Sequence, residues 1–152
     1  MKKFFYFLIF ISFLFSGCKF TPIYSGKDNF DFKIENIEFK GDPEISNLID
    51  KKLKKYIKTE SEKKISISTF SSYAKTSQSK NLSGKTTDYL VEIKTNFKIE
   101  IDNKTKMLIF KEEFLIKNFS NKFEEYNFEK IKKENSIDLI INKLITQISQ
   151  IQ

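Results

Sequence analysis

One side chain in this sequence stands where covalent chemistry is expected, and it belongs to Cys18, the only cysteine. The chain starts Met-Lys-Lys, continues with an apolar run over residues 4–15, and places Ser-Gly directly before the cysteine. A short basic start, an apolar run and small residues before a cleavage point are the parts of a secretory signal peptide. A cysteine directly after Ser-Gly is typical of a bacterial lipoprotein signal. We therefore predict that residues 1–17 are removed and that the Cys18 thiol is acylated at the new N-terminus.

Two other interpretations of the apolar run explain less. The run is twelve residues long with one polar interruption, Ser12, whereas a helix that spans a bilayer needs about twenty residues. A buried core helix would leave the Lys-Lys start and the lone cysteine unexplained. The sequence departs from the usual signal at one place, because Phe15 stands at the third position before the cysteine, where Leu is common. The lipoprotein signal accounts for the remaining features together.

Composition limits the function classes that the mature chain can belong to. Residues 18–152 are enough for one domain with a core. The full chain carries a net charge of +7, and the loss of Lys2 and Lys3 leaves 7 − 2 = +5. Every basic residue is Lys, with no Arg and no His, and the abundance of Phe, Ile, Lys and Asn is typical of an AT-rich genome. We therefore expect most lysines on a solvated surface, and the single cysteine excludes an internal disulfide.

Catalytic and metal-binding patterns are missing from the sequence. Without His, and with Cys18 acylated, neither a Ser–His nor a Cys–His nucleophile can form, and zinc sites built on His or Cys are excluded. The glycines are too scattered for a phosphate-binding loop. Glu112 and Glu113 are adjacent on a predicted strand, so they point to opposite faces and cannot act as an acid–base pair. No nucleic-acid-binding motif is present. We expect no enzymatic activity, no cofactor, no metal and no nucleic-acid partner.

The elements that follow the signal begin with a tether and a strand. Residues 18–29, with Pro22 and Gly26 as breakers, are expected to be the lipidated N-terminus and a tether, and residues 30–152 a single domain. Apolar side chains then alternate and change phase, which predicts a first strand with a bulge near residues 35–36. They are Phe30, Phe32, Ile34, Ile37 and Phe39.

A helix and a second strand are predicted next. Asp42 can cap the helix and Pro43 suits its first turn. The apolar positions recur at helical spacing: Ile45, Leu48, Ile49, Leu53, Tyr56 and Ile57. Lysines between residues 51 and 58 occupy the rest of this helix. Ile65 and Ile67, continuing toward Phe70 and Tyr73, predict the second strand, and residues 76–85 are expected to be a flexible loop with a turn at Gly84.

The strictest alternation runs from Tyr89 to Ile101 and predicts a strand covered on one face. If Asn103 and Lys104 form a two-residue hairpin loop, the register with the next strand is fixed. That register sets Ile99 opposite Leu108, Phe97 opposite Phe110, Ile93 opposite Phe114, Val91 opposite Ile116, Lys94 opposite Glu113, and Thr95 opposite Glu112. Glu112 then lies on the apolar face. It is either solvated where the helices do not reach, or a polar contact in a groove for a partner or ligand.

The chain ends in a second helical pattern, which starts near Glu124. Its apolar stripe contains Ile131, Ile137, Ile140, Ile141, Leu144, Ile145, Ile148 and Ile151. The order of elements is strand, helix, three strands, helix. This order predicts an α+β two-layer sandwich, with a four-stranded, mainly antiparallel sheet and two helices on one face.

The start of the mature chain, Cys-Lys-Phe-Thr-Pro-Ile-Tyr at residues 18–24, resembles the C-G-F-x-P-L-Y start of a known family. This is the α-proteobacterial type of lipopolysaccharide-assembly lipoprotein, the LptE family. The family's order of elements is similar to the one predicted above, so the resemblance extends over the whole mature chain. Lys19 replaces the usual Gly, which still fits sorting to the outer membrane. Only Cys18 transfers residue by residue.

The resemblance implies a non-catalytic component of the lipopolysaccharide translocon, held by lipid on the periplasmic side of the outer membrane. Such a protein would brace or plug a large β-barrel partner of the LptD type. Whether it also contacts lipopolysaccharide stays open. Lys94 and Lys98, and the lysines between residues 51 and 58, are the candidates for facing its phosphates. The alternatives are a generic lipid-anchored binding or structural module, and a biogenesis factor for a different barrel.

Overall fold

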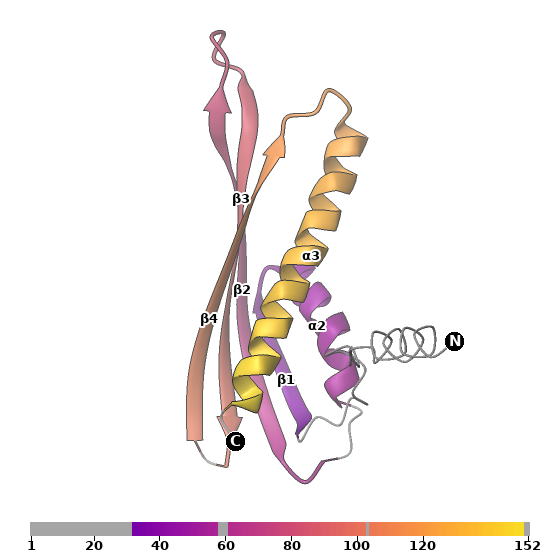
Figure 1. Cartoon of the computed structure of the whole chain (residues 1–152), viewed down its shortest axis with the longest axis vertical. Coiled ribbons are helices and arrows are strands. Elements are labelled where there is room, and N and C mark those ends of the chain that lie inside the picture. The colour runs from indigo at the N-terminus through magenta and orange to yellow at the C-terminus, as the bar shows by residue number, and fades with distance from the viewer. Residues whose placement is uncertain (1–31, 58–60, 103, 151–152) are drawn as a thin grey trace, which may run out of the picture.

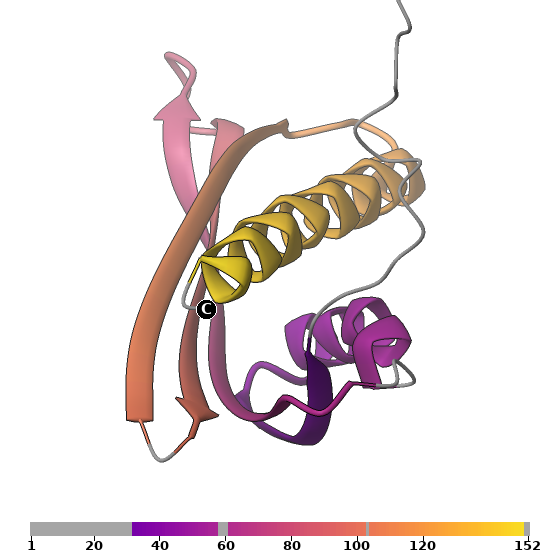
Figure 2. The same cartoon turned by 60° about the horizontal axis from the view of Figure 1, so that its bottom comes forward.

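The computed structural model describes residues 32–57, 61–102 and 104–150. Its elements, in chain order, are β1 (Lys33–Gly41), α2 (Pro43–Ile57), β2 (Lys64–Lys80), β3 (Thr86–Ile101), β4 (Lys104–Lys117) and α3 (Lys122–Ser149). The strands form one sheet in the order β1-β2-β3-β4, with β1 parallel to β2 and the other pairs antiparallel. Both helices lie on one face of it (Figure 2). The predicted α+β sandwich is confirmed, while the signal peptide, Cys18 and the tether lie outside the described residues.

The first strand and helix form as their sequence predicts. The pairing of β1 with β2 shifts between Ile34 and Asn36, at the expected bulge. A side-chain oxygen of Asp42 accepts from the backbone N–H of Ile45 at 2.9 Å, which caps α2. The turn between them needs Gly41, whose φ is 93° and whose missing Cβ would overlap the backbone carbonyl of Ser71. Because of this close approach, β1 and α2 are joined tightly against the middle of β2.

The second strand is longer than predicted, because residues 76–80 belong to β2 and not to a loop. Its pairing with β3 is unbroken from Ile65 to Ser77 and becomes irregular only between Ser77 and Lys80. The side chains here are small and polar, so the strand is held by its ladder with β3 and not by strand propensity. The turn that follows is centred on Asn81, and Gly84 has a φ of 78°, as a turn position requires.

The hairpin between β3 and β4 is displaced from its predicted register. Ile101 pairs with Lys104, so the loop begins one residue earlier than the expected loop at Asn103 and Lys104. As a result, each residue of β3 pairs with a residue of β4 that is two positions nearer to the turn than predicted. The displacement arises at Asp102, whose φ of 48° lies in the left-handed region that Asp tolerates. An even displacement keeps every side chain on its predicted face, but it changes the partners. Lys94 lies opposite Lys111 and not Glu113, and Glu112 lies opposite Ile93 and not Thr95.

The last helix begins two residues earlier than expected, at Lys122, where the Asn121 side chain accepts from the N–H groups of Phe123 and Glu124. One member of its predicted apolar stripe is wrong, because Ile131 is 57 % exposed. Ile151 lies outside the described residues. The core lies between the sheet and the two helices, and its largest fully buried side chains are Phe32, Phe97, Ile34, Ile45, Ile49, Leu53, Ile65, Ile67, Ile93, Ile99, Ile116 and Ile137.

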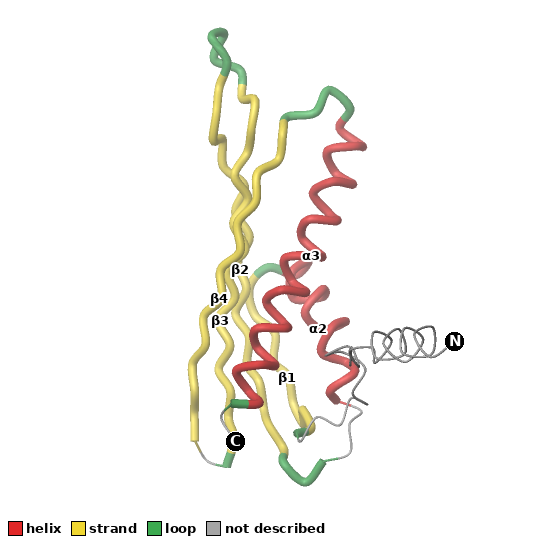
Figure 3. The backbone as a smooth tube through the Cα atoms, in the orientation of Figure 1, coloured by secondary structure: helices red, strands yellow, loops and turns green. Residues whose placement is uncertain are grey.

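Two regions of the molecule differ in how they are covered. β1 and α2 lie along one end of the sheet only, whereas the β2–β3 hairpin and the N-terminal half of α3 extend well past them (Figure 1). The backbone trace shows that no helix or strand of the described residues lies on the opposite face of the sheet (Figure 3). The molecule is therefore long and narrow, with one bare sheet face and an overhanging end.

Candidate interaction surfaces

The bare face of the sheet, here called the outer face, carries exposed apolar side chains among charged ones. Phe70 of β2 and Met107, Ile109 and Leu115 of β4 are 53 %, 59 %, 61 % and 58 % exposed. Phe70 and Ile109 lie on either side of Asn96 in one row across three strands. The side-chain oxygen of Asn96 is buried there without a hydrogen-bond partner. Large apolar side chains grouped on an uncovered surface are typical of a contact surface for another molecule.

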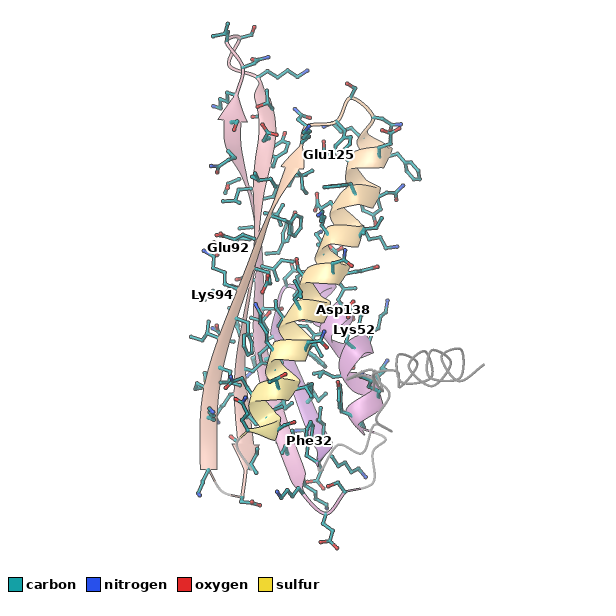
Figure 4. The ribbon with its side chains drawn as sticks, viewed as in Figure 1. Phe32, Lys52, Glu92, Lys94, Glu125 and Asp138 are labelled. Atoms are coloured by element: carbon teal, nitrogen blue, oxygen red, sulfur yellow. The ribbon has the colours of Figure 1, made fainter. Side chains whose placement is uncertain are left out.

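Lys94 and Lys98, both on β3, lie on this outer face as predicted, and Figure 4 labels Lys94. The two lysines differ in their partners. Lys98 donates to Glu100 at 2.6 Å, and this hydrogen bond raises the pKa of its ammonium group. Among the described residues Lys94 makes no ion pair, because its neighbour Lys111 binds Glu92 and Glu113, each at 2.8 Å. Four residues of strand separate the two lysines by about 13 Å. The structure brings them to one face but not to one site.

The lysines of α2 lie on the helical layer, on the other side of the sheet from Lys94. Lys52 binds Asp138 of α3 at 2.6 Å, and Lys54 binds Asp50 within its own helix at 3.1 Å. Lys51 is exposed, and Lys58 lies outside the described residues. The structure therefore separates this row from Lys94 and Lys98, and the predicted phosphate-facing lysines do not form one patch.

Glu112 is mostly buried and makes an ion pair. Its carboxylate is 17 % exposed and accepts from Lys143 of α3. The helix therefore reaches this edge of the sheet through one long side chain, which neutralises the carboxylate. The expectation of a solvated side chain beyond the reach of the helices is wrong, while a contact with a partner or ligand stays a prediction.

A cluster of charged residues that the sequence analysis missed joins α3 to the rest of the fold, and we call it the ionic cluster. It consists of Tyr73 and Lys75 of β2, Glu44 of α2, and Glu125, Glu129 and Lys133 of α3. Lys75 binds Glu125 at 3.0 Å and Glu129 at 2.8 Å, and Lys133 binds Glu129 at 2.9 Å and Glu44 at 2.8 Å. The Tyr73 hydroxyl donates to Glu129 at 2.6 Å.

Burial and pairing act against each other in the ionic cluster. The side chain of Lys133 is 8 % exposed and that of Glu129 is 13 % exposed. Burial alone would raise the pKa of Glu129, but hydrogen bonds from Lys75, Tyr73 and Lys133 outweigh it and lower the pKa to about 2. Burial raises the pKa of the Tyr73 hydroxyl, and the carboxylate of Glu129, to which it donates, raises it further. The hydrogen bonds to Glu44 and Glu129 also outweigh burial at Lys133 and raise its pKa. All these groups are held in one charge state at neutral pH.

The ionic cluster is suited to structure and not to proton transfer. Its carboxylates each bind a lysine, and the pKa of Glu129 lies far from the neutral range that a general acid or base needs. It lies where β1 ends and α2 begins, beneath the overhanging half of α3 (Figure 4, near Glu125). We conclude that it holds this half of the helix on β2 beyond the reach of the apolar core.

Neither metal binding nor membrane crossing has a candidate among residues 32–57, 61–102 and 104–150. No three or more His, Cys, Asp or Glu side chains come together there in a way that could bind a metal ion. None of the helices in this part of the chain is both long and apolar enough to cross a bilayer.

The fold is similar to two solved lipoprotein structures. One is rare lipoprotein B from Shewanella oneidensis, which matches 76 % of this chain and 98 % of its own at 11 % identity and a TM-score of 0.57. The other is an uncharacterized lipoprotein B from Nitrosomonas europaea, which matches 83 % of this chain and 90 % of its own at 10 % identity and a TM-score of 0.52. No family model matches the sequence, and no curated protein matches it. At this identity the likeness shows a shared fold.

Proposed function

We propose that this chain is a non-catalytic lipoprotein of the outer-membrane lipopolysaccharide transport machinery. In this proposal Cys18 carries the lipid, the domain lies on the periplasmic side, and the fold braces or plugs a large β-barrel protein of the LptD type. The observation that carries the proposal is the match to rare lipoprotein B over 98 % of that chain, joined to the lipoprotein signal before the domain. The link to lipopolysaccharide comes from residues 18–24, which resemble the start of the LptE family.

The shape and the outer face support a role inside a barrel. A narrow two-layer domain with one bare sheet face can enter a wide lumen, and the charged and apolar side chains on that face can meet a mixed lining. Phe70 offers apolar contact there, while Lys111 is already neutralised by Glu92 and Glu113. Few charges on this face would have to lose solvent without a partner, which limits the cost of burying the face.

The test of the barrel partnership is co-purification of the full-length lipoprotein from its own membrane. Phe70→Asp, at a side chain 53 % exposed on the outer face, should lower the yield of a large β-barrel protein. The matched control is Leu139→Asp, at a side chain 52 % exposed on the helical layer, which should leave the yield unchanged. A wild-type preparation that captures no barrel protein would contradict the proposal.

Contact with lipopolysaccharide is the second part of the proposal, and it places Lys94 ahead of Lys98. A phosphate can approach Lys94 directly, whereas Lys98 must first release Glu100. Lys94→Glu should therefore weaken binding of purified lipopolysaccharide more than Lys98→Glu. Lys51→Glu, an equal change of charge on the helical layer, should have little effect. Equal losses for all three variants would show a response to net charge alone.

The alternative function is a lipid-anchored binding or structural module unrelated to lipopolysaccharide. The same experiments separate the two, because this alternative predicts no barrel partner and no difference between Phe70→Asp and Leu139→Asp. It shares the anchor, so acylation of Cys18 does not distinguish them.

A further inference from the structure

The last strand of the sheet, β4, is an open edge along its whole length. It pairs with β3 in fourteen consecutive positions without a register shift, and no described element lies on its other side (Figures 1 and 2). Natural edge strands are usually protected by a proline, a bulge, short length or charged side chains, such as one that points inward. The inward-pointing charge of β4, Glu112, is neutralised by Lys143. β4 has no proline and no bulge, and it is fourteen residues long. Its backbone is therefore available to another strand.

The direction of the free backbone groups follows from one hydrogen bond. The N–H of Asn118 donates to the carbonyl of Thr87 at 2.7 Å, just past the end of β4. The backbone N–H and C=O groups alternate in direction along a strand. Even-numbered residues of β4 therefore direct these groups toward β3, and odd-numbered residues direct them outward, away from the sheet. An antiparallel partner must match odd residues with odd residues to accept these bonds.

The side chains of β4 are complementary to a second copy of β4 in one such register. With a two-fold axis at Glu112, Lys111 lies opposite Glu113 of the second copy, and Ile109 lies opposite its Leu115, all on the outer face. On the inner face, Phe110 meets Phe114, and Leu108 meets Ile116. The two Glu112 side chains face each other at the axis, and each is neutralised by Lys143 of its own α3.

The neighbouring registers lack this match. Moving the axis by one residue to Lys111 sets Ile109 opposite Glu113, and moving it to Glu113 sets Lys111 opposite Leu115. Moving it to Phe110 sets Ile109 opposite Lys111. Like charges directly opposite each other destabilise a strand pair, whereas opposite charges and apolar pairs stabilise it. The sequence of β4 therefore favours the axis at Glu112 over these three neighbouring axes.

We propose that two copies of this protein associate through β4, edge to edge, into one continuous sheet with a two-fold axis at Glu112. The pairing is isologous, so it closes at two copies and cannot extend into a fibre. It would cover Ile109 and Leu115, which are 61 % and 58 % exposed, and the half-buried rings of Phe110 and Phe114. The proposal is independent of the lipopolysaccharide role. It concerns the protein that is not bound to a barrel, in which β4 would pair with a second copy.

Cysteine cross-linking of the full-length lipoprotein tests the axis directly. In a non-hydrogen-bonded antiparallel pair the two Cα atoms are about 4.5 Å apart, which a disulfide can span. Glu112→Cys should therefore give a disulfide-linked dimer under mild oxidation. Thr105→Cys lies on the same open edge but about 46 Å from its copy in this register, so it should give none. The unsubstituted chain controls for the thiol of Cys18.

Charge exchange in the Glu112→Cys background tests the register. Lys111→Glu and Glu113→Lys should each lower the dimer yield about fivefold, because each sets like charges opposite each other twice per dimer. The double variant restores both pairs and should restore the yield. Leu115→Lys should also lower it, while Phe70→Lys, equally exposed but away from the edge, should not.

Three outcomes would overturn the proposal. They are a dimer yield from Glu112→Cys no greater than from Thr105→Cys, a double charge variant no better than either single one, and a disulfide to a protein of different mass. Far-ultraviolet circular dichroism of each variant checks that the fold is retained. Because Phe70→Asp acts on barrel capture and Leu115→Lys on self-pairing, failure of one proposal is distinguishable from failure of the other.

Discussion

The substitution Glu129→Gln tests whether the ionic cluster stabilises the fold. It keeps the side-chain volume and an oxygen that can accept from the Tyr73 hydroxyl, but it removes the negative charge from Lys75 and Lys133. The pKa of this carboxyl falls from its ordinary 4.5 to about 2 on folding. A lowering of this size corresponds to about 3 kcal/mol at pH 7. This value agrees with the cost of breaking a buried ion pair, which is about 3–5 kcal/mol.

The same shift fixes the direction of the pH dependence. A carboxyl whose pKa is lower in the folded state contributes its full stabilisation above its unfolded pKa, and loses it as the pH falls through its folded pKa. For Glu129 the contribution is complete above about pH 5, declines toward about 1 kcal/mol at pH 3, and vanishes below pH 2. The free-energy difference between wild type and Glu129→Gln should shrink in the same way.

The assay is urea unfolding of residues 18–152 carrying Cys18→Ser, followed by far-ultraviolet circular dichroism at pH 7 and pH 3. Glu113→Gln is the control, because its carboxylate is 45 % exposed and also binds a lysine. An exposed pair contributes less than about 1 kcal/mol, so this variant should show a small cost at both pH values. A Glu129→Gln cost below about 1 kcal/mol at pH 7, or one equal at both pH values, would refute the reasoning.

Five further variants should give distinct results. Gly41→Ala should lower the free energy of unfolding in urea by more than about 3 kcal/mol, because the φ of 93° is strained and the new Cβ overlaps a backbone carbonyl. Gly84→Ala, whose new Cβ meets no atom, should lower it by about 1 kcal/mol. Asn121→Ala should remove the cap of α3 and cost about 1 kcal/mol, with equal stabilities contradicting the capping role. Phe97→Ala should cost about 3–5 kcal/mol, since the ring is fully buried. Cys18→Ala should abolish incorporation of labelled palmitate, and persistent labelling would refute the lipoprotein prediction.

How far the fold could be predicted from the sequence depended on the strength of each periodic signal. The stripe of α2 and the alternation of β3 are apolar and regular, so both elements were predicted close to their observed ends. The end of β2 was not predicted, because its Ser, Thr and Lys side chains carry no apolar alternation and its conformation comes from pairing with β3. The hairpin register was wrong because both registers keep the same faces, and the backbone at Asp102 decides between them.

The candidate sites could be predicted only in part. The outer-face position of Lys94 and Lys98 followed from alternation, but their ion-pair partners depended on the register. The ionic cluster did leave a signal, because Glu125, Glu129 and Lys133 recur every four residues, in line with the apolar stripe of α3. On α3 the charged residues lie in the N-terminal half and the apolar residues in the C-terminal half of one stripe. Such a stripe indicates one continuous buried face. Its partners on β2 and α2 are distant in the sequence, so no local pattern could identify them.

The hairpin that extends past β1 makes the molecule mechanically uneven. Residues 76–88 include no buried side chain, and the ladder between β2 and β3 is irregular near their turn. Bending this arm therefore disturbs no core contact, and its amide protons should exchange with solvent sooner than those of the covered half of β3. A domain built this way keeps a rigid base where β1 and α2 cover the sheet and presents a compliant tip, which can adjust to the shape of whatever surrounds it.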